Sequence, residues 1–437
     1  MNYPEQVKSM LWADISEMSK SPGRFAKNPN ADFSRKRKLD FENLSRFLIS
    51  MESGATGHEL LKYFDYSPDT PSNSAFYQQR QKLIPEAFLY LLRQFNSRFP
   101  LVKYKGKYNL VGCDGSEFNI ARNPDDPDTF HPPSGKSTKG FNMIHTISLY
   151  DILSKRYLDC VIQPGRKKNE FRAICDLADR YSYGGAPIFI ADRGFSCYNF
   201  FAHAMEKGLF FLVRTKDINT RRLLSLEKLP NQVDTRVEII LSRTQAAKKR
   251  ERPDLAGQYR YISPEVAFDY IEPGASGEYP LSLRVVRFEV VDGVFENIIT
   301  NLPANEFAAD EIKHLYNLRW EIETSFRDLK HTIGATHFHS KKVEYIKQEI
   351  WARMILFNFC SIIAARVVIG IMGAKHVYQV NFAMAIKICH HFIRTRERDP
   401  PIDVEALIGG FTLPIRVGRN FARQHRFQLP VSFCYRF

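Results

Sequence analysis

The apolar positions of residues 315–330 recur at the spacing of a helix, in a segment without Pro or Gly. On a helical wheel, one arc is entirely apolar and consists of Leu315, Leu318, Ile322, Phe326 and Leu329. This pattern predicts a single helix over 315–330 that packs its apolar arc against the core of the protein.

A second arc of the same helix is polar. Its members are Tyr316, Arg319, Glu323 and Lys330. Their spacings of three, four and seven residues make the four side chains point nearly the same way. The carboxylate is suited to holding a metal ion, and its basic and phenolic neighbours are suited to holding phosphates. A solvated stripe with one ion pair is the alternative, because exposed pairs contribute little to stability.

Residues 101–208 carry short apolar runs that indicate strands. Strands are expected at 108–114, 143–151 and 157–163, followed by a helix at 169–181 and a short buried strand at 187–191. Three strands, a helix and then a buried strand is the element order of a ribonuclease-H-like α/β domain.

Residues 209–302 alternate β-branched and aromatic residues with charged ones, which predicts a β-rich insertion in this α/β domain. Its strands are expected at 209–213, 236–241, 258–262, 281–291 and 296–300, with a basic loop at 246–252. A helix that starts near Ala308 then leads into the segment 315–330. Residues 344–373 are expected to form a long apolar helix beneath the sheet.

The two ends of the chain are basic. Short helices are expected before residue 100, among them 39–51 and 74–83, the latter with Ser74 as its N-cap. A cationic cluster at 33–38 precedes them. They suit either a helix-turn-helix-like DNA reader or a helical cap on the next domain. The clustered arginines after residue 374 are either a solvated face or phosphate contacts.

The predicted fold class is α/β, with a ribonuclease-H-like catalytic core interrupted by a β-rich insertion and with helical N-terminal and C-terminal regions. The predicted parts are a helical N-terminal DNA-binding region (1–100), the first part of the core (101–208), the β-rich insertion (209–302), the second part of the core with the Glu-bearing helix (303–373), and a basic C-terminal region (374–437).

Composition adds a partner class to this picture. The 437 residues suffice for two or three domains, and 62 Lys and Arg against 48 Asp and Glu give a net charge of +14. Such a charge indicates a polyanion, most simply nucleic acid, with a membrane surface as the rival. The apolar run 354–373 contains Asn358, Ser361 and Arg366, which favours a buried helix over a membrane span.

The cysteines and the N-terminus indicate a cytoplasmic protein. Seven scattered Cys without a C-x-x-C pair indicate reduced thiols, and the first twenty residues lack the apolar core of a signal peptide. Neither a zinc-ligand spacing nor a phosphate-binding loop motif occurs in the sequence.

Three carboxylates stand out as candidate chemistry. Asp114 and Asp192 each end an apolar strand, and Glu323 lies on the polar arc. Either aspartate alone is more often a turn or cap residue. Three converging acids repel one another and require divalent metal, and oxygen ligands favour Mg²⁺ or Mn²⁺. A pair of such ions is a general device for phosphodiester chemistry.

These residues resemble a known family. Tyr316, Arg319, Glu323 and Lys330 match, in type and spacing, the Y-R-E-K signature of DDE transposases of bacterial insertion sequences, in the IS-four group. Asp114 in Gly-Cys-Asp-Gly-Ser resembles the first acid of that family, and Asp192 in Asp-Arg-Gly-Phe resembles the second. The resemblance covers residues 100–375.

The resemblance implies a DNA transposase, an endonuclease that cuts at the ends of its insertion sequence and joins the 3′-OH ends to target DNA. Asp114, Asp192 and Glu323 would be catalytic and would bind two Mg²⁺ ions, with Mn²⁺ able to substitute. DNA would be held by Tyr316, Arg319, Lys330, Lys136, Lys139 and Arg193. The partners would be element ends, target DNA and, on DNA, a second copy of the chain.

Two other functions are weighed against transposition. One is a metal-dependent DNA nuclease of the same fold that cuts without joining. The other is a non-catalytic DNA-binding protein derived from a transposase, which would be expected to have lost an acid. In each case the expected location is the bacterial cytoplasm, at the nucleoid when bound to DNA, and no membrane partner is expected.

Overall fold

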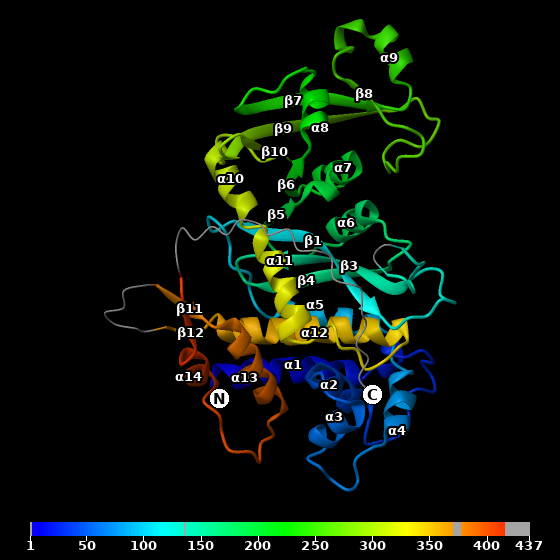
Figure 1. Cartoon of the computed structure of the whole chain (residues 1–437), viewed down its shortest axis with the longest axis vertical. Coiled ribbons are helices and arrows are strands. Elements are labelled where there is room, and N and C mark those ends of the chain that lie inside the picture. Colours follow the sequence, from blue (N-terminus) through cyan, green and yellow to red (C-terminus); the bar gives the residue numbers. More distant parts are fainter. Residues whose placement is uncertain (1, 135–136, 370–376, 416–437) are drawn as a thin grey trace.

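The computed structural model describes residues 2–134, 137–369 and 377–415. A mixed sheet of ten strands runs through this part of the chain, and helices cover both faces of the sheet (Figure 1). Alternate residues of the central strands enter two separate hydrophobic clusters, one on each face. The architecture is therefore three-layered α/β.

Three antiparallel strands form one half of the central sheet. β1 (Tyr108–Ile120) pairs with β3 (Phe141–Asp151), and β3 pairs with β4 (Arg156–Pro164). The short strand β2 (Phe130–His131) adds to β3, inside the segment expected to be a loop. The strands expected at 108–114, 143–151 and 157–163 are confirmed, and β1 extends past Asp114.

Two parallel strands form the other half. β5 (Ala186–Ala191) pairs parallel to β1, and β6 (Phe210–Thr215) pairs parallel to β5. Helix α6 (Glu170–Asp179) leads from β4 to β5, and α7 (Tyr198–Glu206) leads from β5 to β6. The resulting order β4–β3–β1–β5–β6 is the ribonuclease-H-like arrangement and confirms the predicted fold class.

The remaining strands continue the same sheet. The order beyond β6 is β10 (Val294–Thr300), β9 (Glu278–Val291), β7 (Val233–Ser242) and β8 (Tyr259–Tyr261). The strand expected at 209–213 is thus β6, which pairs with β5 of the core. The division of the chain into domains stays a prediction, and the sheet crosses the boundary placed at residue 209.

One basic segment of this region is not a loop. Residues 246–252 were expected to be a loop, but α9 (Gln245–Glu251) covers most of them. Its sequence, Gln-Ala-Ala-Lys-Lys-Arg-Glu, consists of good helix formers, and the Thr244 carbonyl accepts from the amides of Ala247 and Lys248. A second helix, α8 (Asp217–Leu224), lies between β6 and β7.

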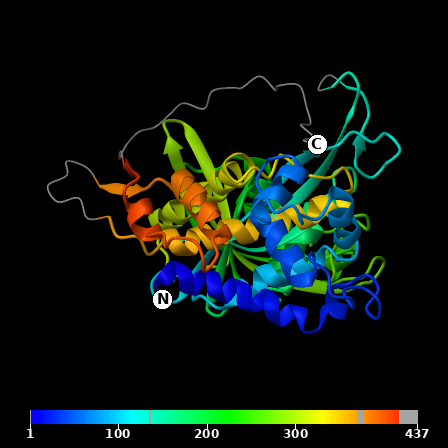
Figure 2. The ribbon, with the colours of Figure 1, turned by 90° about the horizontal axis from the view of Figure 1, so that it is seen from below.

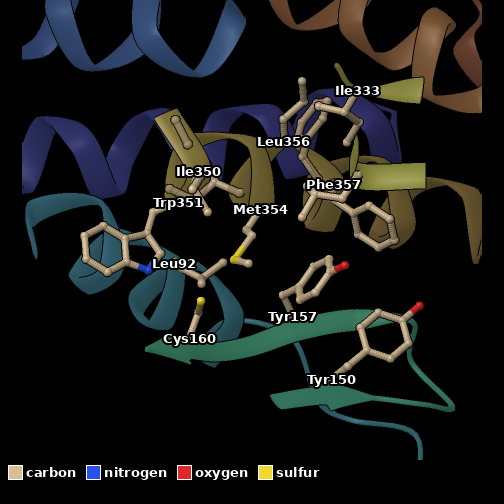
Figure 3. Close-up of a cluster of buried hydrophobic side chains, with 14 of the residues drawn as sticks. Leu92, Tyr150, Tyr157, Cys160, Ile333, Ile350, Trp351, Met354, Leu356 and Phe357 are labelled. Carbon is tan, nitrogen blue, oxygen red and sulfur yellow. The ribbon is translucent and has the colours of Figure 1, made fainter. Parts of the chain in front are cut away.

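Helix α12 (Val343–Ala364) is buried between the sheet and the N-terminal helices. The helix expected over 344–373 is too long, because α12 ends at Ala364, and residues 370–373 lie outside the described part. Its apolar residues pack against strands β3 and β4 and against α5. Figure 3 shows this cluster, with Ile350, Trp351, Met354, Leu356 and Phe357 of the helix near Tyr150, Tyr157, Cys160 and Leu92.

Buried polar groups also join α12 to the sheet. Asn358 accepts from the Tyr157 amide at 2.8 Å and donates to the Tyr157 carbonyl at 2.7 Å. It also donates to Asn96 Oδ1 at 3.0 Å. These contacts fix the position of the helix along β4.

Across residues 2–134, 137–369 and 377–415, every helix is too short or too polar to span a membrane.

The N-terminal helices lie on the α12 side of the sheet (Figures 1 and 2). They are α1 (Tyr3–Ser19), α2 (Phe41–Ser50), α3 (Thr56–Tyr63), α4 (Asn73–Arg80) and α5 (Glu86–Ser97). The N-cap of α4 is Ser72 and not Ser74, since the Ser72 hydroxyl oxygen accepts from the Ala75 amide at 3.2 Å. Their packing on α12 is what a helical cap requires, and a role in reading DNA stays a prediction.

The C-terminal region adds α13 (Phe382–Arg394), α14 (Val404–Gly409) and a two-stranded sheet of β11 (Tyr378–Val380) and β12 (Thr412–Pro414). Its arginines reach acids of the N-terminal region. Arg394 lies 2.9 Å from Glu59 Oε2, and Arg396 lies 2.8 Å from Asp65 Oδ2. These two arginines are therefore engaged within the protein. The arginines after residue 415 lie outside the described residues.

Candidate active site

Asp114 and Asp192 lie on neighbouring parallel strands, Asp114 within β1 and Asp192 directly after the end of β5. Cys113 of β1 pairs in register with Ala191 of β5, so the next residue of each strand is an aspartate at the same edge of the sheet. Asp192 caps the short 3₁₀ helix η2 (Arg193–Phe195), its Oδ1 accepting from the Gly194 amide at 2.7 Å. Asp114 Oδ1 accepts from the Gly115 amide at 2.8 Å. The topology thus brings the two aspartates together.

Glu323 comes to these aspartates from a different part of the chain. It lies on α11 (Trp320–Arg327), which packs on β1 through the buried side chain of Ile322. The predicted single helix over 315–330 is wrong: α10 (Ala309–Asn317) ends before α11 begins. The amides of Arg319 and Ile322 bond to carbonyls three residues earlier, so the connection is a tightened turn and the face of the helix is kept.

The charges of the three acids act on one another. Burial raises the pKa of Asp114 to about 7, and the negative charges of Glu323 and Asp192 add to this effect. The Gly115 amide and the Arg319 guanidinium oppose the rise but do not cancel it. A buried carboxyl that loses its proton only near neutral pH is poised to bind a cation, because a cation would compensate the charge.

The donor set fits a hard divalent cation, since it consists of carboxylate oxygens on adjacent elements. The side chains are not at ligand spacing as they stand. In the part of the chain that the structure describes, no group of three or more His, Cys, Asp and Glu side chains is spaced to hold a metal ion. Glu323 is turned toward Arg319, so ligation by all three acids requires that this carboxylate be released.

Arg319 and Tyr316 are buried behind Glu323. Arg319 Nη1 donates to Glu323 Oε1 at 2.7 Å, and its guanidinium lies 4.8 Å from the ring centre of Trp320. Burial raises the pKa of Tyr316, and the charges of Arg319 and Arg214 oppose this rise. The two side chains are only 5% and 3% exposed. The stripe predicted from spacing exists, but these two members are covered and not solvated.

Lys330, the last member of the stripe, contacts the strand that bears Asp114. It sits in the π-helical turn that follows α11 (η4, Asp328–Thr332). Its Nζ donates to the Glu117 carbonyl at 2.7 Å and lies 4.8 Å from the ring centre of Phe118. Burial lowers the pKa of Lys330, while the charges of Glu117 and Asp114 oppose the fall. A widened turn thus holds an ammonium group at the strand that bears Asp114.

A cleft of about 1090 Å³ opens over the two aspartates. Asp114, Asp192 and Lys330 line it, together with the segment around β2, whereas Glu323 does not. Because acidic and basic side chains line this cleft, it suits a charged ligand.

The three other predicted DNA-binding residues are Arg193, Lys139 and Lys136. Arg193 is exposed and directly follows Asp192. Lys139 is exposed in the loop between β2 and β3, where its carbonyl accepts from Arg122 Nε at 3.0 Å. Lys136 lies outside the described residues. Neither Arg193 nor Lys139 lines the cleft.

Two residues of the cleft were missed by the sequence analysis. His145 of β3 and Glu170 of α6 both line it, with His145 Nε2 at 3.0 Å from Glu170 Oε1. Neither lies in a recognisable motif. The available signals were a histidine within an otherwise apolar strand and an acid directly after the N-cap Asn169. Such signals are common in proteins without any site.

Comparison with known proteins gives one family. Residues 105–359, more than half of the chain, match the family described as "Transposase DDE domain". The matched segment contains both aspartates, Glu323 and the residues of its helical stripe.

Curated relatives match over short segments. The chain is 32% identical over 73 residues to a putative transposase InsL for insertion sequence element IS186A of Escherichia coli, which is 16% of this chain and 20% of that protein. It is 32% identical over 89 residues to the transposase InsG for insertion sequence element IS4 of E. coli, which is 20% of each. The matches thus span about a fifth of the length of these relatives.

A solved structure of similar extent is the piggyBac transposase in a synaptic complex with hairpin DNA. It is 11% identical to this chain, with a TM-score of 0.46, over 96% of this chain and 87% of the other.

Proposed function

The chain belongs to the family of proteins with a transposase DDE domain, and from that premise we propose that it is a DNA transposase. It would cut DNA at the ends of its insertion sequence and join the resulting 3′-OH ends to target DNA. The observation that carries this proposal is that Asp114 is buried within reach of the charges of Asp192 and Glu323, which together with burial raise its pKa to about 7.

Asp114, Asp192 and Glu323 are proposed as the ligands of two Mg²⁺ ions, with Mn²⁺ able to substitute. When bound, such ions activate the attacking oxygen and stabilise the leaving oxygen of a phosphodiester. Strand β1 holds Asp114, and the capped turn after β5 holds Asp192. Glu323 is held by Arg319 at 2.7 Å until a cation competes for it.

The basic residues around the acids are proposed to hold the DNA backbone. Lys330 presents its ammonium group at the cleft, and Arg319 remains next to Glu323, so both can neutralise phosphate charge. Tyr316 supports Arg319 from the buried side, with the guanidinium 5.7 Å from its ring centre. Arg193, Lys139 and Lys136 are proposed as outer phosphate contacts.

The finer assignment is the IS-four group, on the Tyr316, Arg319, Glu323 and Lys330 spacing. The spacing alone supports that group. The partners proposed are element ends and target DNA, and joining two ends would need a homodimer assembled on DNA. The proposed location is the bacterial cytoplasm, at the nucleoid.

A cleavage and strand-transfer assay tests this function. The substrates are the DNA segments that flank the gene, with Mg²⁺, and wild-type protein is compared with Glu323→Gln, which keeps the shape of the side chain. Cutting and joining by wild type, with both lost in the variant, supports the proposal. Cutting without joining would indicate a nuclease, and binding of the ends without cutting by either protein would indicate a DNA-binding protein.

A further inference from the structure

Glu170 and His145 form a pair at the cleft that the three acids do not explain. Glu170 begins α6, and its side chain is 31% exposed, while the His145 side chain on β3 is 4% exposed. His145 Nε2 lies 3.0 Å from Glu170 Oε1. The contact with His145 is the leading cause that lowers the pKa of Glu170, so this carboxylate is held in its charged form.

His145 is a polar side chain that is buried without full hydrogen bonding. Its Nδ1 has no hydrogen-bond partner among the described residues, and its Nε2 reaches Glu170 in an orientation outside good hydrogen-bond geometry. Burying an imidazole with one free nitrogen costs free energy. An apolar residue would serve the strand better, so the position of His145 is explained by what it does at the cleft.

Two glycines keep the space between Glu170 and the aspartates open. A Cβ on Gly115 would lie 2.9 Å from His145 Nε2 and 3.6 Å from Glu170 Oε1. A Cβ on Gly194 would lie 2.9 Å from Asp192 Oδ1 and 3.7 Å from Glu170 Oε2. The two oxygens of Glu170 therefore face the backbone directly after Asp114 and the backbone that caps Asp192.

Glu170 also has a basic neighbour at the cleft. The Lys168 ammonium is nearby, 3.7 Å from Glu170 Oε1 and 3.2 Å from Glu117 Oε1, and it lies nearer to Glu117.

On this geometry we propose that Glu170 is a fourth carboxylate ligand of the divalent-cation site, and that His145 positions it. The proposal rests on the proposed function, because it assigns Glu170 to the cation that Asp114, Asp192 and Glu323 would bind. It accounts together for the burial of an imidazole against Glu170 and for the two glycines that face the Glu170 oxygens. A purely structural ion pair would explain neither.

The test is Mn²⁺ binding by the full-length chain, measured by electron paramagnetic resonance. Glu170→Gln is expected to weaken Mn²⁺ binding by about tenfold or more, the size of effect found for residues that support a metal site. His145→Leu is expected to weaken it similarly, and His145→Gln, which keeps a donor group, is expected to restore part of the affinity. Thermal unfolding in EDTA verifies that each variant folds.

Two matched controls separate ligation from general charge. Glu117→Gln removes a carboxylate from the same cleft, on the other side of Lys168. Asp176→Asn removes one from α6, where it pairs with Arg172 away from the cleft. Both are expected to bind Mn²⁺ like wild type. If Glu117→Gln weakens binding as much as Glu170→Gln, the proposal is overturned, because the effect is then one of cleft charge.

A second readout locates the cation directly. Fe²⁺ with ascorbate and peroxide cuts a polypeptide next to bound iron, and cuts are expected near residues 114, 192 and 170. If Glu170→Gln binds Mn²⁺ with normal affinity and wild type shows no cut near residue 170, the assignment of Glu170 as a ligand is overturned. The proposed function still stands in that case, provided that Glu323→Gln weakens Mn²⁺ binding. If wild type binds no Mn²⁺ and shows no cuts, the proposed function falls with it.

Discussion

Arg319 and Glu323 form an ion pair across one turn of α11, with 2.7 Å between Nη1 and Oε1. The arginine is buried, its ring neighbours Tyr316 and Trp320 flank it, and the glutamate is half-buried. Because the same carboxylate is the proposed third ligand, we propose that the pair keeps Glu323 oriented and charge-compensated until a cation binds.

We expect Arg319→Ala and Lys330→Ala each to weaken DNA binding while the protein still folds. Each removes one cation next to the proposed phosphate path, so the slope of log binding constant against log salt should fall by about 0.9 per substitution. Fluorescence anisotropy over a salt series measures it. An exposed lysine away from the cleft, Lys20, provides Lys20→Ala as a control. Unchanged slopes in both variants would contradict the assignment of these residues to phosphates.

The pKa of Asp114 predicts how stability depends on pH. The carboxyl titrates near 3.8 in the unfolded chain and at about 7 in the folded protein, so between these values the folded state binds more protons. This residue therefore lowers the free energy of unfolding as pH rises from about 4 to 7. Asp114→Asn should stabilise the metal-free protein at pH 8 by on the order of 2–4 kcal/mol and change little at pH 3.5.

Urea unfolding in EDTA at the two pH values measures this effect. The same substitution in Asp176, which is away from the site, provides the control. If Asp114→Asn is no more stable than wild type at pH 8, burial of the Asp114 charge does not destabilise the folded protein.

Cation binding should stabilise the fold. The acids bind the ion only when assembled, so saturating Mg²⁺ is expected to raise the free energy of unfolding by about 2.7 kcal/mol at a hundred times Kd. Asp192→Asn should lose most of this gain, and EDTA should remove it from wild type. Calorimetry with and without Mg²⁺ measures the shift, and an equal shift in both proteins would contradict the placement of the ion at Asp192.

The anchor of α12 offers a prediction that concerns the fold alone. Asn358→Ala leaves the Tyr157 amide without the acceptor that it has at 2.8 Å, whereas the Tyr157 carbonyl keeps a second donor, Asn96 Nδ2, at 2.7 Å. We expect a loss of roughly 1–3 kcal/mol, because a buried backbone amide would be left unpaired. Lys347→Ala, on the half-exposed face of the same helix, should change stability little. Equal urea midpoints for the two variants would contradict this anchoring role.

Much of the fold could be predicted because its signals are local, whereas the role of the three acids stays a prediction. Strand periodicity located β1 and β5, which bring Asp114 and Asp192 onto neighbouring strands, although β1 continues past Asp114. Helical spacing placed Arg319 and Glu323 on one face, and that face survives the turn between α10 and α11 because the turn is only tightened.

The parts that were missed depend on contacts between distant segments. The residues around Leu318 include neither Pro nor Gly, so the sequence carries no strong sign of the break. The burial of Tyr316 follows from packing on other elements. His145 and Glu170 are brought together by the pairing of β3 and the start of α6, and neither residue has a partner at a motif spacing. Helix α9 forms in place of the expected loop because the helix propensity of its residues outweighs the repulsion within its basic run.

The most direct test of the account is metal-specific rescue at Asp192. Asp192→Cys replaces a hard oxygen ligand with sulfur, which Mg²⁺ accepts poorly and the softer Mn²⁺ accepts more readily. Cleavage and joining of element-end DNA by this variant should be lost in Mg²⁺ and recovered in Mn²⁺, while wild type works in both. Equal activity of the variant in the two ions, or none in either ion from a protein that still binds the ends, would contradict the claim that Asp192 is a ligand.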